Sequence, residues 1–382
     1  MTRPLPDLHM VPDYHEEGWI SMTVCSDMLH DQLLRDHAER IRLHREIPRF
    51  IPDFQRIAGK SRPTFNADRF INRFIRYPAW IKSRLRTPAI YHVVDHSYAH
   101  LLHSLPGGVM GCYCHDIDAF RSLFDPSIRW QRRWYNGIAQ LLLSGIRRAD
   151  VVFHSTRFVR EEILQHGIVE PDRLVQAPLG FSAQFCAEPV PLSERLKAAL
   201  EPMGPSRFLL HVGSCVPRKR VDVLLETLAG VRREVDDLWL VKVSGTFSPQ
   251  HEAIIEREGL RGRIVHLQGL STVELAALFQ RCAMVLQPSS KEGFGMPIIE
   301  AMACGALVLA SDIPVLREVG GQAAVYVELG NVQAWTAAVA GVLSGAEVVP
   351  TREQRLEQAG RYSWRTHAGI IVNTYLRLGG YA

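Results

Sequence analysis

One stretch of the chain, residues 289–305, constrains the fold more than any other. It reads SSKEGFGMPIIEAMACG and follows a short apolar run at 283–286, which has the length and composition of a buried parallel strand. Pro297 suits the first turn of a helix, and Gly305 suits the stop at its C-terminus. The pattern predicts a strand, a polar glycine loop and a helix. Such a loop lies at the carboxyl edge of a sheet, where open α/β sheets bind ligands.

The residues of this loop suit ligand binding. Gly293 and Gly295 let the backbone approach a ligand closely, and the helix N-terminus behind them favours negatively charged oxygens. Glu292 stands in the loop, and Glu300 lies eight residues further on in the helix, so two carboxylates are placed to hold two ends of one ligand. The alternative is a surface turn before an ordinary amphipathic helix, in which an unpaired glutamate among apolar neighbours would be costly.

The stretch resembles the E-x7-E signature of retaining nucleotide-sugar glycosyltransferases of the GT-B fold, family four (glycosyl transferases group 1). Glu292 and Glu300 match its two glutamates. The resemblance implies an α/β fold of two Rossmann-like, doubly wound domains that face each other across a cleft, and it implies neither a metal nor a cofactor. It also implies that the loop and the helix bind the donor through Gly293, Phe294, Gly295, Met296 and Glu300.

Size and composition restrict the class of protein. The length of 382 residues suggests two domains, and the hydrophobic fraction of 47% is that of an ordinary globular protein. A net charge of +4 does not by itself indicate nucleic-acid binding. Seven cysteines without a Cys-x-x-Cys pair argue against a disulfide framework or a zinc site and for a reducing compartment. Neither a signal peptide nor an apolar run of about 18 to 20 residues is present, so we expect a cytoplasmic protein.

A second strand-to-loop pattern lies in the same half of the chain. The apolar strand 207–213 ends at Gly213, and a turn with Arg218 and Lys219 precedes the next helix. Cations at a helix start are favourable only beside an anion, so the pattern predicts a diphosphate site, with a basic helix start exposed to water as the alternative. In the resembled family Lys219 matches the phosphate-binding lysine. Ser214 stands where many relatives carry arginine, and Arg218 is the candidate for that second charge.

Alternating apolar and helical patterns predict a parallel, doubly wound sheet in this half. The apolar runs are 238–243, 264–270, 307–311 and 323–327. In the resembled family, the backbone after the second of these runs holds the nucleotide base, which makes Leu267, Gln268 and Leu270 donor-binding candidates.

The domain boundary is predicted in the irregular, proline-rich segment from Pro178 to Pro205. We expect an acceptor-binding domain over 1–185, on which a C-terminal helix at 365–382 packs back, and a donor-binding domain over 186–364. The first of these domains is less easily recognised than the second.

The first half holds one candidate site residue at the end of an apolar strand, 108–114. His115 and Asp116 match a Thr/Cys-x-His-Asp segment of the resembled family, in which the histidine contacts the donor sugar. Asp116 is expected to orient His115 or to cap a helix, and a histidine satisfied in the core is the alternative reading. The strand-to-helix change between His92 and His96 breaks a ligand spacing among the histidines from 92 to 103. Asp116 and Asp118 form an Asp-x-Asp pair, which alone is weak evidence for a metal, so no metal site is expected. Ser155 is predicted to cap the following helix.

The segment 35–86 is basic, with 14 Lys and Arg against 5 Asp and Glu. Its part 69–86 interleaves aromatic residues with cations, which suits contact with an anionic membrane at its inner face. The favoured alternative is a solvated helix that packs its Phe and Ile side inward. A polyanionic acceptor is a third reading, and no nucleic-acid motif is present.

Together with the resemblance, these features predict a retaining glycosyltransferase of cell-surface polysaccharide or glycolipid synthesis. It would move a sugar from a UDP- or GDP-sugar to a saccharide or lipid-linked acceptor. Lys219, with Arg218, would neutralise the leaving diphosphate. Glu292 would hold sugar hydroxyls, Glu300 the ribose hydroxyls, and His115 would contact the sugar from the first domain. The alternatives are a nucleotide-sugar 2-epimerase and a non-catalytic nucleotide-sugar binding protein.

Overall fold

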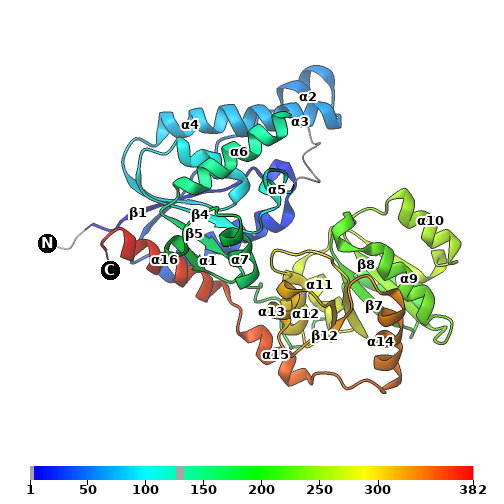
Figure 1. Cartoon of the computed structure of the whole chain (residues 1–382). Helices are drawn as coiled ribbons and strands as arrows, with labels where there is room; N and C mark the ends of the chain where they lie inside the picture. The colour runs from blue at the N-terminus through cyan, green and yellow to red at the C-terminus, as the bar shows by residue number, and fades with distance from the viewer. Residues whose placement is uncertain (1–3, 126–132, 382) are drawn as a thin grey trace. The chain divides into compact units, whose positions relative to one another are not determined.

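The computed structural model describes residues 4–125 and 133–381 (Figure 1). The chain divides into two compact units, Met1–Leu179 with Trp364–Ala382, and Gly180–Ser363. Within the described residues each unit has one six-stranded sheet whose neighbouring strands are all parallel. The prediction of two doubly wound α/β domains is confirmed at the level of each unit.

The first unit has the strand order β2-β1-β3-β4-β5-β6. The direction of the connections reverses between β1 and β3, so the crevice above these two strands is a topological switch point. Its strands are β1 (Asp7–Val11), β2 (Arg42–Arg45), β3 (Ala89–Val93), β4 (Gly108–Cys114), β5 (Val151–His154) and β6 (Leu174–Gln176).

Helices cover both faces of this sheet, with α4 and α6 on one side and α1 and α16 on the other (Figure 1). Because both faces are covered, strands such as β4 and β5 are apolar along their length instead of alternating. The α-helices are α1 (Ile20–His37), α2 (Asp53–Ala58), α3 (Arg62–Ile71), α4 (Tyr77–Arg84), α5 (Arg121–Phe124), α6 (Arg133–Arg148), α7 (Arg157–Gln165) and α16 (Trp364–Leu378). Shorter helical segments are η1 (His15–Glu17), η2 (Asn72–Arg76), η3 (His96–His103), η4 (Asp118–Phe120) and η6 (Pro171–Arg173).

The C-terminal helix α16 is part of the first unit. The hydroxyl of Tyr375 lies 2.7 Å from Nδ1 of His92 on β3, and Gly111 on β4 leaves room for this ring. Trp364, at the start of the helix, is buried. The C-terminal helix α16 therefore packs on β3 and β4 and completes the core of the first unit.

The helix after β5 differs in detail from the sequence prediction. Its N-cap is Thr156, whose side chain accepts a hydrogen bond from the N–H of Val159 at 3.3 Å. The predicted cap, Ser155, is wrong by one residue. Both residue types cap well, so the sequence does not separate them.

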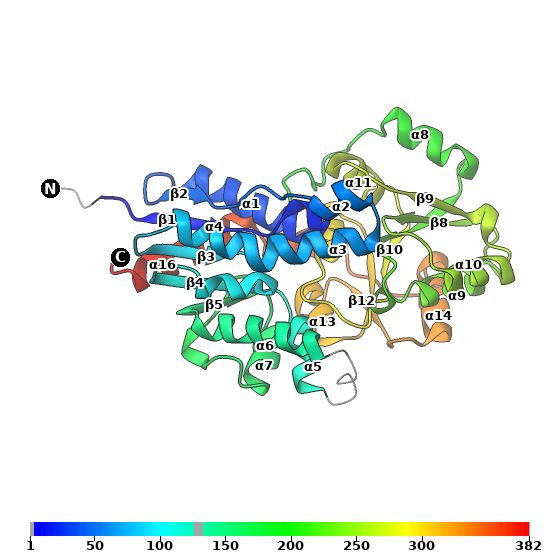
Figure 2. The same ribbon diagram turned by 90° about the horizontal axis from the view of Figure 1, so that it is seen from above.

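The second unit has the strand order β12-β11-β10-β7-β8-β9, with its switch point between β7 and β10. Its strands are β7 (Arg207–Val212), β8 (Leu238–Val243), β9 (Ile264–Leu267), β10 (Met284–Gln287), β11 (Val308–Ser311) and β12 (Val325–Val327). Leu224 and Leu228 of one helix and Trp335 of another belong to the core that packs on β7 and β8. Figure 2 shows the same sheet from above.

The helices of this unit complete the alternating pattern. They are α8 (Glu194–Leu200), α9 (Val221–Val231), α10 (Pro249–Arg257), α11 (Thr272–Phe279), α12 (Met296–Ala303), α13 (Pro314–Gly320), α14 (Val332–Ser344) and α15 (Arg352–Gly360), with η7 (Glu201–Met203), η8 (Pro217–Lys219) and η9 (Arg261–Arg263). Across both units, no helix of the described residues is long and apolar enough to cross a membrane.

The packing of α6 against η3 can be tested at one glycine. A Cβ added at Gly145 would collide with the carbonyl oxygen of Ala99, whereas a Cβ at Gly137 of the same helix would meet no atom within 4 Å. Gly145→Ala should therefore destabilise the protein by about 1 to 3 kcal/mol, because backbone atoms would have to move. Gly137→Ala, the matched control, should stabilise it by up to about 1 kcal/mol through helix propensity. Urea unfolding measures both, and equal effects would contradict the packing described.

Candidate functional site

Two loops meet at the switch point of the second unit. One follows β7 and contains Gly213 to Lys219, and the other follows β10 and contains Ser289 to Gly295. Since β7 and β10 are neighbouring parallel strands, their carboxyl ends lie side by side. The N–H of Ser290 donates to the carbonyl of Arg218 at 2.8 Å and ties the loops together. The structure thus brings the two stretches singled out in the sequence to one place.

Glu292 is the centre of this cluster. Its Oε1 accepts from Nζ of Lys219 at 2.6 Å and from Nε2 of Gln287 at 2.7 Å, and its Oε2 accepts from the Arg218 guanidinium at 3.0 Å. Glu292 is 6% exposed and Lys219 8%. Burial would raise the pKa of Glu292, but the charges of Lys219 and Arg218 outweigh it, and the pKa is lowered. The cluster therefore holds an ionised carboxylate between two cations.

The loop after β10 exposes its backbone rather than its aromatic side chain. Phe294 is 5% exposed and packs 5.5 Å from the ring of Tyr362, so only its main chain is placed to reach a ligand. Gly295 has a φ of 91°, and a Cβ there would press on Leu316. Gly293 and Met296, on either side, are half-buried.

Glu300 lies in α12, one helical turn beyond the loop. Its side chain is half-buried, and within the described residues it has no hydrogen-bond or ion-pair partner. Burial raises its pKa to about 7. A carboxyl group in this state would be stabilised by hydroxyl donors from a ligand.

A buried lysine that the sequence analysis missed lies under the turn after β7. Nζ of Lys242 donates to the carbonyls of Gly213, Val243 and Ser244, and burial lowers its pKa to about 8. The strand register places His211 beside it, and neither ring nitrogen of His211 has a hydrogen-bond partner in the described part of the chain. The signal in the sequence is a single lysine inside the apolar run LWLVKV. Lys242 fixes the turn that ends at the exposed Ser214.

The residues predicted to contact a base are already engaged within the unit. Leu267 is buried, Nε2 of Gln268 donates to the carbonyl of Gly245 at 3.0 Å, and Leu270 is half-buried. The guanidinium of Arg195 donates to the carbonyls of residues 268 and 269. The side chain of Gln268 is thus held by one hydrogen bond, and the main-chain carbonyls of residues 268 and 269 are occupied by Arg195.

His115 lies at the carboxyl end of β4 in the first unit. Its Nε2 donates to the carbonyl of Val94 at 3.2 Å, so the neutral ring presents Nδ1 as an acceptor. Burial lowers the pKa of His115, which favours this neutral form. Its backbone N–H lies 3.3 Å from Nδ1 of His96, whose Nε2 lies 3.6 Å from Asp116. The charge of Asp116 acts on both histidines, and its Oδ1 accepts from the N–H of Asp118 at 2.9 Å.

The same edge holds an acidic pair that the sequence analysis missed. Asp13 follows β1 and Asp95 follows β3, which are the two strands at the switch point. Asp13 is 7% exposed, and burial with the nearby charge of Asp95 raises its pKa to about 8. Asp95 accepts from the N–H and the hydroxyl of Ser97 and lies 3.1 Å from His96. The signal was an aspartate two residues after the end of each of two strands.

The basic segment 69–86 is only partly exposed. Arg73 is buried, lies 3.4 Å from the carboxylate of Glu17 and stacks over Tyr98 at 4.2 Å. The hydroxyl of Tyr98 donates to the other oxygen of Glu17 at 2.6 Å. Phe70 and Ile75, by contrast, are 43% and 52% exposed. Arg73 is therefore part of the core, while Phe70 and Ile75 face solvent.

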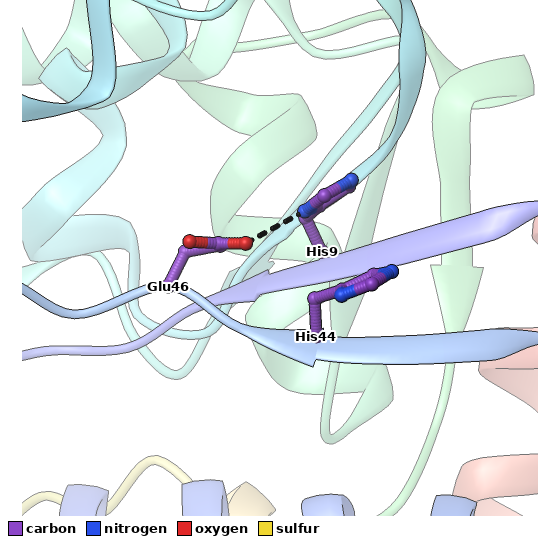
Figure 3. A group of neighbouring side chains, drawn as sticks. All are labelled: His9, His44 and Glu46. Atoms are coloured by element: carbon purple, nitrogen blue, oxygen red, sulfur yellow. Dashed lines mark hydrogen bonds and ion pairs between the residues drawn. The ribbon is translucent and has the colours of Figure 1, made fainter. Parts of the chain in front are cut away.

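Figure 3 shows a cluster with the composition of a metal site, formed by His9 on β1, His44 on β2 and Glu46 directly after β2. His9 Nδ1 lies 2.9 Å from Glu46, and Nε2 of His44 donates to Asp7 at 2.8 Å. The two imidazoles are stacked at 4.6 Å with planes only 16° apart. In-plane lone pairs of nearly parallel rings do not meet at one ion, and turning either ring would break one of these bonds. The geometry is that of a hydrogen-bonded ladder across two strands.

Comparison with known proteins places this geometry in context. Residues 193–362 match the family model described as glycosyl transferases group 1. The chain is 26% identical over 278 residues to the serotype-specific mannosyltransferase WbdA of Escherichia coli, covering 70% of this chain and 33% of that protein. It is 29% identical over 276 residues to the MMP alpha-(1->4)-mannosyltransferase of Mycolicibacterium hassiacum, covering 68% and 63%. The chain thus spans about a third of the length of WbdA.

Solved structures of similar fold cover nearly the whole chain. The sucrose-phosphate synthase of Thermosynechococcus elongatus has a TM-score of 0.69 at 17% identity, covering 99% of this chain and 100% of that one. Anabaena Alr3699/HepE, in complex with UDP and glucose, has a TM-score of 0.69 at 15% identity, covering 97% and 99%. At these identities the likeness concerns the fold, and it confirms the GT-B architecture predicted from the sequence.

Glu292→Gln should destabilise the protein at neutral pH by about 3 kcal/mol, because Lys219 would stay buried without its counter-charge. The pKa of Glu292 is lowered on folding, so its contribution is present above the unfolded value of about 4.3 and is lost as the pH falls further. Urea unfolding of both proteins should give the full difference at pH 7 and a smaller one below about pH 4. Glu226→Gln, which alters a surface pair with Arg257, is the control and should change little.

Asp13→Asn should change the stability of the protein in the opposite direction. The pKa of Asp13 is raised to about 8 on folding, so its ionisation opposes the folded state increasingly as the pH rises from about 4 to 8. The variant should match wild type near pH 4 and be more stable at pH 8 by urea unfolding. Asp236→Asn, at an 86% exposed side chain, should show no such trend. A variant less stable than wild type at pH 8 would contradict the burial of an uncompensated acid.

Proposed function

We propose that the chain is a retaining glycosyltransferase of the glycosyl transferases group 1 family, because residues 193–362 match the model of that family. Its donor would be a nucleotide-diphosphate sugar held by the second unit, and its acceptor a saccharide or a lipid-linked saccharide. Two relatives are named as mannosyltransferases, which makes mannose the first sugar to test. Another relative, 27% identical over 237 residues, is the O-antigen chain mannosyltransferase B of Escherichia coli, which supports a role in cell-surface polysaccharide or glycolipid synthesis.

One observation carries the proposal. Lys219 and Arg218 converge on one anionic group at the switch point, beside the N-terminus of α12. A diphosphate presents the same charge in the same kind of place, where a helix N-terminus and two cations stabilise it. Glu292 provides the anion in the structure described here, so a bound diphosphate would share the cations with it.

In the proposed reaction these cations act when the bond between the sugar and the diphosphate breaks. When the bond between the anomeric carbon and the diphosphate oxygen breaks, the electron pair leaves with the diphosphate, and negative charge grows there. Lys219 and Arg218 would stabilise this charge more in the transition state than in the bound donor. The acceptor hydroxyl attacks on the same face, which retains the configuration, and its proton passes to the departing phosphate oxygen.

The remaining site residues would position the donor. Glu292 and the backbone around Gly293 and Gly295 are assigned to the sugar hydroxyls, and the unpartnered carboxyl of Glu300 to the ribose hydroxyls. His115, with Nδ1 presented as an acceptor, is assigned to a hydroxyl of the transferred sugar. Gly213 and Ser214 would bring main-chain and hydroxyl groups to the diphosphate.

The first unit would receive the acceptor. Phe70 and Ile75 expose apolar surface in a basic segment, and this supports contact with the anionic membrane in which a lipid-linked acceptor would be embedded. Binding of the purified protein to vesicles with and without anionic lipid would test that contact separately from the transfer reaction.

A nucleotide-sugar 2-epimerase and a non-catalytic binding protein are the rival proposals. An epimerase would convert a nucleotide sugar in the absence of any acceptor. A binding protein would be stabilised by a nucleotide sugar but would never release nucleoside diphosphate. A glycosyltransferase needs both donor and acceptor for product, apart from slow donor hydrolysis.

The prediction is that one of a panel of UDP- and GDP-hexoses, including GDP-mannose, raises the melting temperature of the protein and is turned over with saccharide acceptors. Lys219→Ala should lower turnover by about 10² or more, as the loss of a preorganised charge does. Lys197→Ala, at an exposed lysine paired with Glu194, is the matched control and should keep wild-type turnover. Normal turnover of Lys219→Ala would rule out its assigned role, and no stabilisation by any donor would contradict the function.

A further inference from the structure

A pocket of about 590 Å³ lies on the other edge of the sheet of the second unit. It is lined by the ends of α11 and α12, by the residues just before β10 and β11, by part of α15 and by the segment 187–189. β10 and β11 begin here, whereas Glu292 stands where β10 ends, so a four-residue strand of about 13 Å separates the two places. This pocket is not part of the site around Glu292.

Three arginines line the pocket without counter-ions. Arg281 donates to the carbonyl of Ala277 at 2.9 Å, and Arg352 donates to the carbonyl of Ala187 at 3.0 Å. Nε of Arg355 is buried and has no hydrogen-bond partner among the residues that the structure describes. None of the three forms an ion pair within the part of the chain that the structure describes, and no acid is among the lining residues.

The charges of these arginines are crowded. Burial lowers the pKa of Arg355, and the neighbouring charge of Arg352 lowers it further. The two acids that act on them from outside the pocket are Glu188, which is exposed, and Glu353, also exposed. Neither comes within ion-pair distance, so the repulsion inside the pocket is not relieved by a side chain.

Part of this charge has a structural explanation. α11 and α12 both end at the pocket, and the C-terminus of a helix carries about half a negative charge, which favours cations nearby. Two such ends account for about one of the three positive charges. An excess of about two positive charges remains, and it calls for an anion.

We propose that this pocket binds the phosphoryl group of a small phosphorylated molecule. The planar guanidinium groups offer paired N–H donors, which match the oxygens of a phosphate better than an ammonium group does. Phe279, Leu307 and Pro189 provide apolar walls for the rest of the molecule. The volume lies in the range of about 300 to 1,000 Å³ that is typical of small-molecule sites.

The test uses a variant in which the first site is disabled. Inorganic pyrophosphate and, separately, glucose 6-phosphate are titrated calorimetrically into full-length Lys219→Ala protein, at constant ionic strength set with chloride. One binding site should remain, and Arg281→Ala and Arg355→Met should each weaken it by about tenfold or more, since each removes charge-assisted bonds. Tighter binding of glucose 6-phosphate than of pyrophosphate would identify an organic phosphate, and the reverse order an inorganic one.

Controls separate loss of binding from loss of fold. Arg257→Ala alters a surface arginine of the same unit, paired with Glu226 and Glu258, and should leave the titration unchanged. Circular dichroism and the melting temperature without ligand show whether each variant is folded, and if Arg355→Met is not, the exposed Arg281 decides the question. Loss of all binding in Lys219→Ala, or binding that neither arginine variant weakens, would overturn the proposal. Because the measurement is of binding alone, its failure would leave the proposed transfer reaction untouched.

Discussion

The ionic contact between Glu292 and its two cations holds the functional edge of the second unit together. Lys219 reaches it from the loop after β7, and Glu292 from the loop after β10, which are 73 residues apart in the chain. Neither charge is tolerable alone at such burial, so each loop depends on the other for its conformation. The backbone bond between Ser290 and Arg218 strengthens the same connection.

Each unit has a buried carboxyl group at its switch point, and the pKa values of the two groups are shifted in opposite directions. In the second unit the carboxylate of Glu292 is compensated, and its pKa is lowered. In the first unit burial and the charge of Asp95 raise the pKa of Asp13, and the charge of Arg73 offsets them only in part. An uncompensated acid at a ligand-binding edge lowers stability, and proteins tolerate such a cost mainly where a ligand uses the group. Asp13 is therefore a candidate ligand-binding residue of the first unit, as His115 is.

The part of the site that could be predicted from the sequence is the part encoded locally. Glu292 and Lys219 each lie in the short connection between an apolar strand and a helix, so their place at a sheet edge follows from a few neighbouring residues. Asp13 and Asp95 are separated by an 82-residue step, and only the strand order brings them together. Lys242 looks like an exposed residue of a strand until the register shows the carbonyls that it meets. The inward turn of Arg73 likewise depends on Glu17, far away in the sequence.

The helix α12 connects the loop of Glu292 with the arginine pocket. It starts at Met296, beside the loop of Glu292, and ends at Ala303, where Cys304 and Gly305 line the arginine pocket. Eight residues of α-helix form a stiff rod about 12 Å long. An anion in the arginine pocket and a donor beside Glu292 would therefore act on the two ends of one rigid element, at opposite edges of the sheet.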